Sequence, residues 1–169
     1  MDLIVRRHGA QEAILQCGRD LYRAAIGMGG IGFKRREGDG LTPVGTFPLR
    51  LVLYRADRLA HPKAGLPVSK IQAADGWCDA PLDPNYNRRV KRPYGASTEA
   101  LWRDDSLYDL LVVLGFNDAP VVPGAGSAMF LHVARPDFSP TAGCIALAAA
   151  DLVKVIGTLK TGDSIAITS

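Results

Sequence analysis

The sequence predicts a mainly β fold, or an α+β fold with a small helical part, in one domain over residues 1–169. Three observations lead there. Short apolar segments separated by glycines fill the first third of the chain, and two continuous apolar runs follow later. Only one segment, near the C-terminus, has a clear helical period. Strands of this length with turn residues between them are typical of β-rich domains, and a chain of this size can bury a core without disulfides.

Four strands are expected in the first third: Leu3–Val5, Ala13–Cys17, Tyr22–Ile26 and Gly45–Tyr54. In the last of these, apolar residues alternate with others, as on a strand with one buried face. The middle segment 76–93 is rich in proline, aspartate and asparagine. We expect a long loop there, because long irregular segments in compact domains are usually functional or mobile.

The second half is predicted to hold two buried strands, at Leu110–Leu114 and Met129–Val133, because both are continuous apolar runs. A Pro/Gly-rich turn region, residues 120–127, separates them. A weaker helix is expected over Thr98–Arg103, with Ser97 as its N-cap.

The C-terminal segment predicts a helix followed by a strand. The helix should begin near Ala148, since it carries an apolar stripe at helical spacing, formed by Leu152, Val155, Ile156 and Leu159. Gly162 ends that pattern, and Ser164–Thr168 then alternates like a terminal strand.

Composition excludes several classes of protein. The net charge is +3 with 22% charged residues, and no apolar run reaches the roughly 20 residues of a membrane span. The basic run Arg88–Arg92 is interpreted as a solvated loop, so no nucleic-acid partner is expected. Cys17, Cys78 and Cys144 form no C-x-x-C pair, and the histidines are scattered. This argues against a zinc site and a disulfide framework, although a Cys17–Cys78 bridge in an oxidising compartment stays open.

Two kinds of functional motif, a dinucleotide-binding loop and a serine nucleophile, are not supported by the sequence. The segment 27–32 has the letters G-x-G-x-x-G, but no helical stripe follows it, so a glycine-rich turn between strands is expected rather than a dinucleotide site. No serine stands three residues before a lysine, and there is no G-x-S-x-G elbow. Serine nucleophiles of these types are therefore excluded, and cysteine chemistry is left.

The candidate nucleophile is Cys144, which follows Gly143 and precedes the predicted helix. His132 ends an apolar strand twelve residues earlier. A thiol needs its thiolate to attack a carbonyl, and a nearby imidazole can take the proton. Each residue also has a structural interpretation: a buried small hydrophobe for Cys144, a scaffold residue for His132, and a surface residue for Arg135.

The segment from His132 to Ile145 resembles the signature of the L,D-transpeptidase (YkuD-type) catalytic domain, a histidine followed by Ser/Thr-x-Gly-Cys and an apolar residue. Here the signature is His132 with Thr141-Ala-Gly143-Cys144-Ile145. Thr42-Pro-Val-Gly-Thr-Phe47 is similar to the Thr-Pro-x-Gly-x-Phe element of the family, and residues 161–167 resemble its final strand. Thr-Ala-Gly-Cys-Ile-Ala replaces the common Ser-His-Gly-Cys-x-Arg, which indicates a divergent branch.

This resemblance implies a fold and a set of roles. The fold would be the family's β-sandwich with one long helix after the cysteine. Cys144 would be the nucleophile, His132 its base, the Val133 carbonyl would orient the imidazole, and the amides of Gly143 and Cys144 would hold an oxyanion. Arg135 would replace the missing arginine as the group that binds the stem-peptide carboxylate. The further substrate-binding candidates are Thr141, Tyr86, Asn87 and Asn117. The loop with Trp77, Asp79, Tyr86 and Asn87 is expected to form a wall or lid of the cleft, with an ordinary surface loop as the open alternative.

The implied activity is peptidoglycan L,D-transpeptidation. Cys144 would form a thioester at an L–D amide of one stem peptide and pass the acyl group to an amine of a second stem, giving a 3–3 or 1–3 crosslink. An L,D-peptidase or amidase using the same pair, and a non-catalytic cell-wall binding module, stay open as alternatives. We expect no cofactor or metal, a monomer, and a periplasmic or cell-wall location tied to bacterial cell shape. No secretion signal is visible near the N-terminus.

Overall fold

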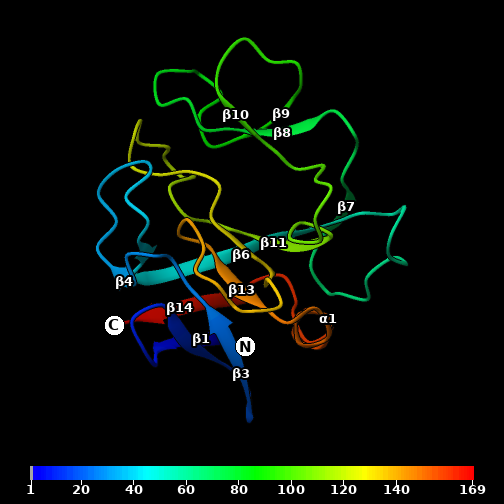
Figure 1. Cartoon of the computed structure of the whole chain (residues 1–169). Helices are drawn as coiled ribbons and strands as arrows, with labels where there is room; N and C mark the ends of the chain where they lie inside the picture. Colours follow the sequence, from blue (N-terminus) through cyan, green and yellow to red (C-terminus); the bar gives the residue numbers. More distant parts are fainter. Residues whose placement is uncertain (1) are drawn as a thin grey trace.

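The computed structural model describes residues 2–169 and is organised around one nine-stranded sheet (Figure 1); the first residue of the predicted domain lies outside the described part. The sheet has the order β11-β12-β13-β3-β2-β1-β14-β6-β7. Its strands are β1 (Asp2–Arg7), β2 (Glu12–Cys17), β3 (Asp20–Ala25), β6 (Gly45–Tyr54), β7 (Val68–Lys70), β11 (Leu110–Leu114), β12 (Phe130–Val133), β13 (Ile145–Leu147) and β14 (Ser164–Thr168). All the strands predicted from apolar patterns are confirmed, and β13, directly after Cys144, is an additional one.

This sheet closes on itself. The long strand β6 pairs with β14 through residues 45–48 and with β11 through residues 49–54. The additional pairing β11–β6 joins the first strand of the order to the last but one, so the sheet is barrel-like and β7 extends it at the edge of β6. The expected sandwich of two separate sheets is therefore corrected: ten residues of β6 are long enough to pair with different partners along their length, which leaves no separate second layer in the described sheet.

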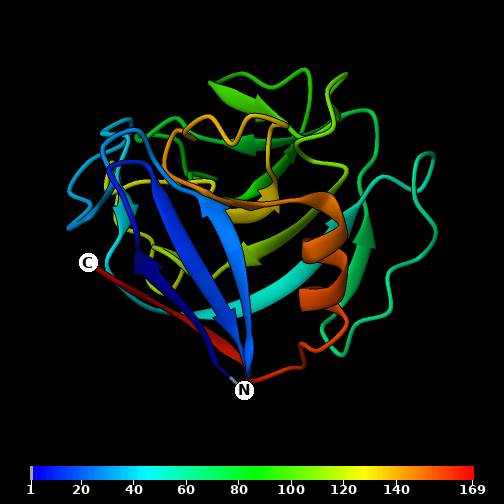
Figure 2. The same ribbon diagram turned by 60° about the horizontal axis from the view of Figure 1, so that its bottom comes forward.

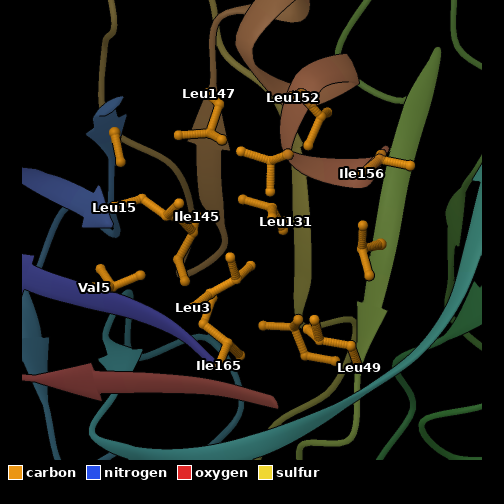
Figure 3. Close-up of a cluster of buried hydrophobic side chains, with 14 of the residues drawn as sticks. Leu3, Val5, Leu15, Leu49, Leu131, Ile145, Leu147, Leu152, Ile156 and Ile165 are labelled. Atoms are coloured by element: carbon orange, nitrogen blue, oxygen red, sulfur yellow. The ribbon is translucent and has the colours of Figure 1, made fainter. Parts of the chain in front are cut away.

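The main core lies inside the closed sheet, where apolar side chains of several strands meet (Figure 3). Leu3 and Val5 point inward from β1, Leu131 from β12, and Ile145 and Leu147 from β13. Alternation along each strand explains this arrangement, because every second side chain faces the same side of a sheet. On the other face of β12, Phe130 belongs to a second apolar cluster.

The one α-helix among residues 2–169, α1 (Ala149–Ile156), packs against the closed sheet (Figure 2). Its buried residues Leu152, Val155 and Ile156 join the main core, as the apolar stripe predicted. The helix has eight residues and is therefore shorter than the long helix that we expected. It ends at Gly157, and Leu159 reaches the core from the turn that follows the helix.

A smaller three-stranded sheet lies apart from the closed sheet, on the side away from the N-terminal strands (Figure 1). It has the order β10-β8-β9 and is formed by β8 (Asp75–Cys78), β9 (Arg89–Lys91) and β10 (Thr98–Ala100). The predicted helix at Thr98–Arg103 is wrong, because residues 98–100 pair antiparallel with β8. The predicted loop 76–93 is corrected in part: both of its ends are strands, joined by turns.

The glycine-rich segment forms a turn after β3 and leads into β4 (Ile31–Gly32), which pairs with β5 (Thr42–Pro43). The prediction of a turn rather than a dinucleotide site is confirmed, since no helix follows it. Cys17 and Cys78 are both free and buried. No helix in residues 2–169 has the length and hydropathy needed to cross a membrane.

Candidate active site

Two neighbouring strands carry the predicted catalytic pair. β12 and β13 run parallel with Leu131 opposite Ile145 and His132 opposite Ala146. Cys144 therefore enters β13 beside Phe130, and the Phe130 amide donates a hydrogen bond to its Sγ at 3.4 Å. The twelve-residue connection thus returns to the strand from which it started. His132 and Cys144 line the same cavity.

The segment before Cys144 is held by backbone and hydroxyl contacts. Gly143 has a φ of +143°, where an added Cβ would lie 2.9 Å from the Leu41 carbonyl oxygen. Only glycine fits that conformation at that distance. Thr141 Oγ1 donates to the Cys144 carbonyl at 2.6 Å and accepts the Gly143 amide at 3.1 Å. These contacts fix the backbone that presents the thiol.

The same segment is tied to the element that contains Thr42. Thr42 is fully buried, and its hydroxyl donates to the Gly143 carbonyl at 2.8 Å. The hydroxyl oxygen also accepts the Gly27 amide at 2.8 Å. One buried side chain therefore connects the glycine-rich turn with the cysteine segment, and the two motifs quoted for the family resemblance meet in space.

The His132 imidazole is buried and has a fixed orientation. Its Nδ1 lies 2.9 Å from the Val133 carbonyl oxygen. A carbonyl can only accept, so Nδ1 carries the proton and Nε2 is left as the basic nitrogen. The Tyr108 ring packs edge-on against the imidazole at a centroid distance of 5.2 Å. Burial lowers the His132 pKa to about 4, with Arg103 and Arg135 acting in the same direction and the Val133 contact opposing it.

The Cys144 thiol is in a protonated resting state. Its Sγ donates to the Ala128 carbonyl at 3.2 Å. Burial raises the Cys144 pKa to about 12, and the negative charge of Glu99 adds to that rise, while the Phe130 amide and Lys34 oppose it. With a thiol pKa near 12 and an imidazole pKa near 4, both groups are neutral at pH 7. A thiolate is therefore not the resting form, and a thiol in this state needs a base that accepts its proton as the sulfur attacks a carbonyl.

A cavity of about 390 Å³ opens in front of this pair. The residues that line it come from the cysteine segment, β12, the small sheet and the segments before β5, β11 and β12: Lys34, Glu37, Gly38, Asp79, Glu99, Arg103, Leu107, Tyr108, Ser127, Ala128, Met129, His132, Arg135, Thr141, Ala142, Gly143 and Cys144. The cavity is in the size range of small-ligand sites.

Several of the predicted site residues lie at this cavity. Thr141 and Arg135 from the signature segment and Asp79 from the loop line it together with Cys144 and His132. Gly143 also lines it, but its amide donates to the Thr141 hydroxyl, so the backbone N–H expected to face an oxyanion already has an acceptor. Of the two amides that we expected to hold the oxyanion, that of Cys144 remains as the candidate.

Tyr86, Asn87 and Asn117 lie behind the cavity wall and are not among its lining residues. Tyr86 is 2% exposed, and its hydroxyl donates to Glu37 Oε2 at 2.5 Å. The Asn87 amide nitrogen donates to the Phe116 and Asn117 carbonyls. The Asn117 side chain holds the turn at residues 122–126. Their polar atoms are engaged inside the protein, so the expected contact of these three residues with substrate has no support in this geometry.

Sequence reasoning missed a carboxylate next to the nucleophile. Glu99 lines the cavity, and the Tyr108 hydroxyl donates to its Oε1. Burial raises the Glu99 pKa. No signal in the sequence marked this residue, because it lay in a segment that was expected to be helical. Thr42 is part of the Thr-Pro-x-Gly-x-Phe element, but the sequence did not reveal its contact with Gly143. The two residues are 101 positions apart in the chain and meet only in the fold.

Among residues 2–169, no group of three or more histidine, cysteine, aspartate or glutamate side chains is placed to hold a metal ion. The cavity presents a part-buried thiol, a neutral imidazole, backbone amides and the charged groups that line it. That set suits acyl transfer through a covalent thioester.

Comparison with known proteins adds family evidence. Residues 3–167 match a family profile described as YkuD, L,D-transpeptidase catalytic domain. The crystal structure of L,D-transpeptidase 1 from Mycobacterium tuberculosis aligns with a TM-score of 0.42 and 13% sequence identity. The alignment covers 99% of this chain and 62% of that chain. A comparison with curated proteins gave no match.

Proposed function

We propose, from the premise that this chain belongs to the L,D-transpeptidase catalytic domain family, that it is a peptidoglycan L,D-transpeptidase with Cys144 as nucleophile and His132 as base. The observation that carries the proposal is the pairing of β12 with β13, which brings both residues to one cavity. The substrates would be two stem peptides, one as acyl donor and one as amine acceptor.

In the first half-reaction, Cys144 Sγ attacks the carbonyl of a donor amide that has an L-centre on its acyl side and a D-residue on its amine side. A C–S bond forms and the C–N bond breaks. The thiol proton passes to His132 Nε2 and from there to the leaving amine. The Val133 carbonyl holds the ring in the required tautomer, and the Cys144 amide supports the oxyanion; one such donor typically contributes about 10²–10³ in rate.

In the second half-reaction, an amine of the acceptor stem attacks the thioester carbonyl. A C–N bond forms, the C–S bond breaks, and His132 Nε2 transfers a proton from the amine to the departing sulfur. The site returns to its neutral thiol and imidazole. Arg135, exposed at the rim of the cavity, is placed to bind a stem carboxylate through a forked pair of hydrogen bonds. The crosslink is of the 3–3 or the 1–3 type.

The reaction sets the expected location. Peptidoglycan stems are crosslinked outside the cytoplasmic membrane, so we propose a periplasmic or cell-wall location and a monomeric enzyme. A role in maintaining bacterial cell shape follows from that location and from the crosslinking reaction.

The test is a product analysis. Purified protein is incubated with disaccharide-tetrapeptides, and the products are separated and identified by mass spectrometry. Dimeric muropeptides are expected, and fragmentation identifies the linkage. Cys144→Ala should form none. Cys17→Ala is the matched control, since it removes a buried free cysteine outside the cavity.

Two other results would overturn the proposal in different ways. Shortened monomers without dimers would show that water takes the acyl group, which makes the protein an L,D-peptidase or amidase with the same catalytic pair. Binding of muropeptides that is equal in the wild type and in Cys144→Ala, without any product from tetrapeptide or pentapeptide donors, would indicate a non-catalytic cell-wall binding module.

A further inference from the structure

Three cations and three carboxylates line the cavity, but two of the cations are already paired with carboxylates outside it. Of its three cations, Lys34 pairs with Asp39 at 2.5 Å and Arg103 pairs with Asp105 at 2.6 Å. Both partners lie outside the cavity lining. The third cation, Arg135, has no ion pair among the described residues.

Three carboxylates line the same cavity, those of Glu37, Asp79 and Glu99, and none of them forms an ion pair within residues 2–169. Glu37 accepts hydroxyl groups from Tyr86 and Ser127. When the partners Asp39 and Asp105 are counted with the lining, three cations face five carboxylates, a net charge of about −2 if all are ionised. The protein as a whole has a charge of +3, so the cavity is locally opposite in sign.

The register of the small sheet explains why two of these carboxylates are neighbours. Glu99 in β10 lies opposite Trp77 in β8, and the Asp79 amide extends the ladder by donating to the Ser97 carbonyl at 3.2 Å. Asp79 is two residues from Trp77, so Asp79 and Glu99 are diagonal neighbours on one face of the sheet. The Trp77 ring packs on Phe130 of β12, which means that this face is turned towards the catalytic strands.

Asp79 supplies a second and independent observation. Its Oδ1 atom is buried and has no hydrogen-bond partner. A buried carboxylate oxygen without a donor carries a desolvation cost, because it has lost the hydrogen bonds that water would give it. Like charges at diagonal positions of a sheet also repel. A cationic donor bound between Asp79 and Glu99 removes both costs.

The geometry points to a cationic substrate subsite at Asp79 and Glu99, which we call the acidic wall: it binds the protonated primary amine of the acceptor stem peptide before that amine attacks the thioester. This inference rests on the proposed transpeptidase function and specifies which chemistry the acceptor must carry. A metal ion does not fit the same wall, because the described side chains include no group of three ligands in metal-binding range.

The ammonium group must lose one proton before it attacks. We assign that proton to the Glu99 carboxylate, whose pKa is raised mainly by burial and which is therefore a better proton acceptor than an exposed glutamate. The free amine then attacks the thioester, and His132 carries its second proton to sulfur as described above. The Glu99 proton leaves to solvent. Ammonium binding also neutralises the charge of Glu99, which contributes to the high Cys144 pKa.

The experiment measures the donor and acceptor steps separately in Asp79→Asn and Glu99→Gln. A glutamine keeps the carbonyl oxygen that accepts the Tyr108 hydroxyl, so the fold at this point is preserved. With disaccharide-tetrapeptide as donor and a diaminopimelate-containing stem as acceptor, each variant should raise the acceptor KM by about 10- to 100-fold. The donor step, read as the Cys144 acyl adduct by intact mass, should still occur. Glu12→Gln, a change in an exposed ion pair with Arg23, is the matched control.

A binding measurement provides a second readout. Cys144→Ala is titrated with the acceptor stem and with the same stem acetylated on its side-chain amine, and the acetylated form should bind at least about tenfold more weakly. Equal binding of the two forms, or an unchanged acceptor KM in both variants while the adduct still forms, would overturn the acidic wall as an amine subsite. Failure of the wild type to form any adduct would instead overturn the proposed function itself.

Discussion

The two sides of the catalytic cavity are constructed differently. The nucleophile side, formed by His132, Gly143 and Cys144, belongs to strands of the closed sheet and is neutral, with its positions fixed by backbone contacts. The opposite side is the acidic wall, Asp79 and Glu99, which is supplied by the small sheet and is charged and incompletely paired. Under the proposed function, the chemistry is therefore built into the core, whereas substrate selection is assigned to the small sheet outside it.

The largest expected effect is the loss of Cys144 acylation when the base is removed. We expect His132→Ala to lower the rate of Cys144 acylation by about 10²–10⁴, because the thiol then has no nearby base to take its proton. Stopped incubations with donor peptide followed by intact mass would give this rate. His8→Ala removes an exposed histidine and should act like the wild type. A similar rate in His132→Ala and His8→Ala would contradict the role of His132.

The connection between the two sides depends on Asn87. Its Oδ1 accepts the Trp77 indole N–H at 2.9 Å and the Ala128 amide at 3.1 Å, in addition to its two donated bonds. Asn87→Ala leaves these buried groups unsatisfied, so the free energy of unfolding should fall by about 3 kcal/mol or more. Urea denaturation measures it. Asn85→Ala, at an exposed position, should cost less than about 1 kcal/mol; an equal loss in both would contradict this account.

The neutral state of the nucleophile side predicts a pH dependence of stability. The His132 pKa is about 4 in the folded protein and 6.5 without the fold. The imidazole therefore contributes stability that is fully present above pH 6.5 and is lost as the pH falls from 6.5 towards 4. The total is about 3 kcal/mol.

Unfolding free energies measured between pH 7 and 4 would test this contribution, with His132→Gln as the variant that lacks the titrating group. The decline over this range should be smaller in the variant by roughly that amount. Parallel curves for the two proteins would show that His132 titrates normally and is not held neutral by burial.

Thr42 links the glycine-rich turn to the cysteine segment, and its loss should have a smaller effect. Thr42→Val keeps the shape but removes the hydroxyl between the Gly27 amide and the Gly143 carbonyl. We expect a loss of about 2 kcal/mol in stability and slower acylation, because the Cys144 backbone loses a fixed contact. Thr42→Ser keeps the hydroxyl and should recover most of both. Slow acylation in the serine variant would indicate that the methyl group matters instead.

The smallest expected effect is on the reactivity of Cys144. It tests whether the acidic wall influences the nucleophile across the cavity. The charge of Glu99 contributes to the raised Cys144 pKa. Glu99→Gln should therefore lower that pKa and speed alkylation of Cys144 by iodoacetamide several-fold at pH 8. Mass spectrometry of the labelled peptide gives the rate. A slower rate in the variant would mean that Glu99 assists the thiolate rather than opposing it.

Cys144, His132 and Gly143 were singled out in the sequence chiefly by the family resemblance, and the structure places all three at one cavity, while their catalytic roles stay predictions. The closed sheet could not be predicted, because closure depends on the pairing of β6 with β11, whose residues are far apart in the chain. The expected helix at residues 98–103 failed because local capping signals were overridden by pairing with β8. Glu99 was hidden by that error.

Tyr86, Asn87 and Asn117 illustrate a related limit. Polar residues in a long loop can contact substrate or can hold the loop in place, and the sequence does not distinguish the two. The structure gives all three internal partners. Asn87 and Asn117 adopt φ values of 60° and 49°, which asparagine tolerates better than most residues. Their residue types therefore fit a backbone requirement.

The most direct test of the central claim is to find where the acyl group goes. The wild type and Cys144→Ala are incubated with a tetrapeptide donor, and intact mass is followed by peptide mapping. We expect an adduct that maps to Cys144 in the wild type and no adduct in the variant, as required for covalent catalysis by this thiol. An adduct on another residue, or dimeric product formed by Cys144→Ala, would contradict the assignment of Cys144 as the nucleophile.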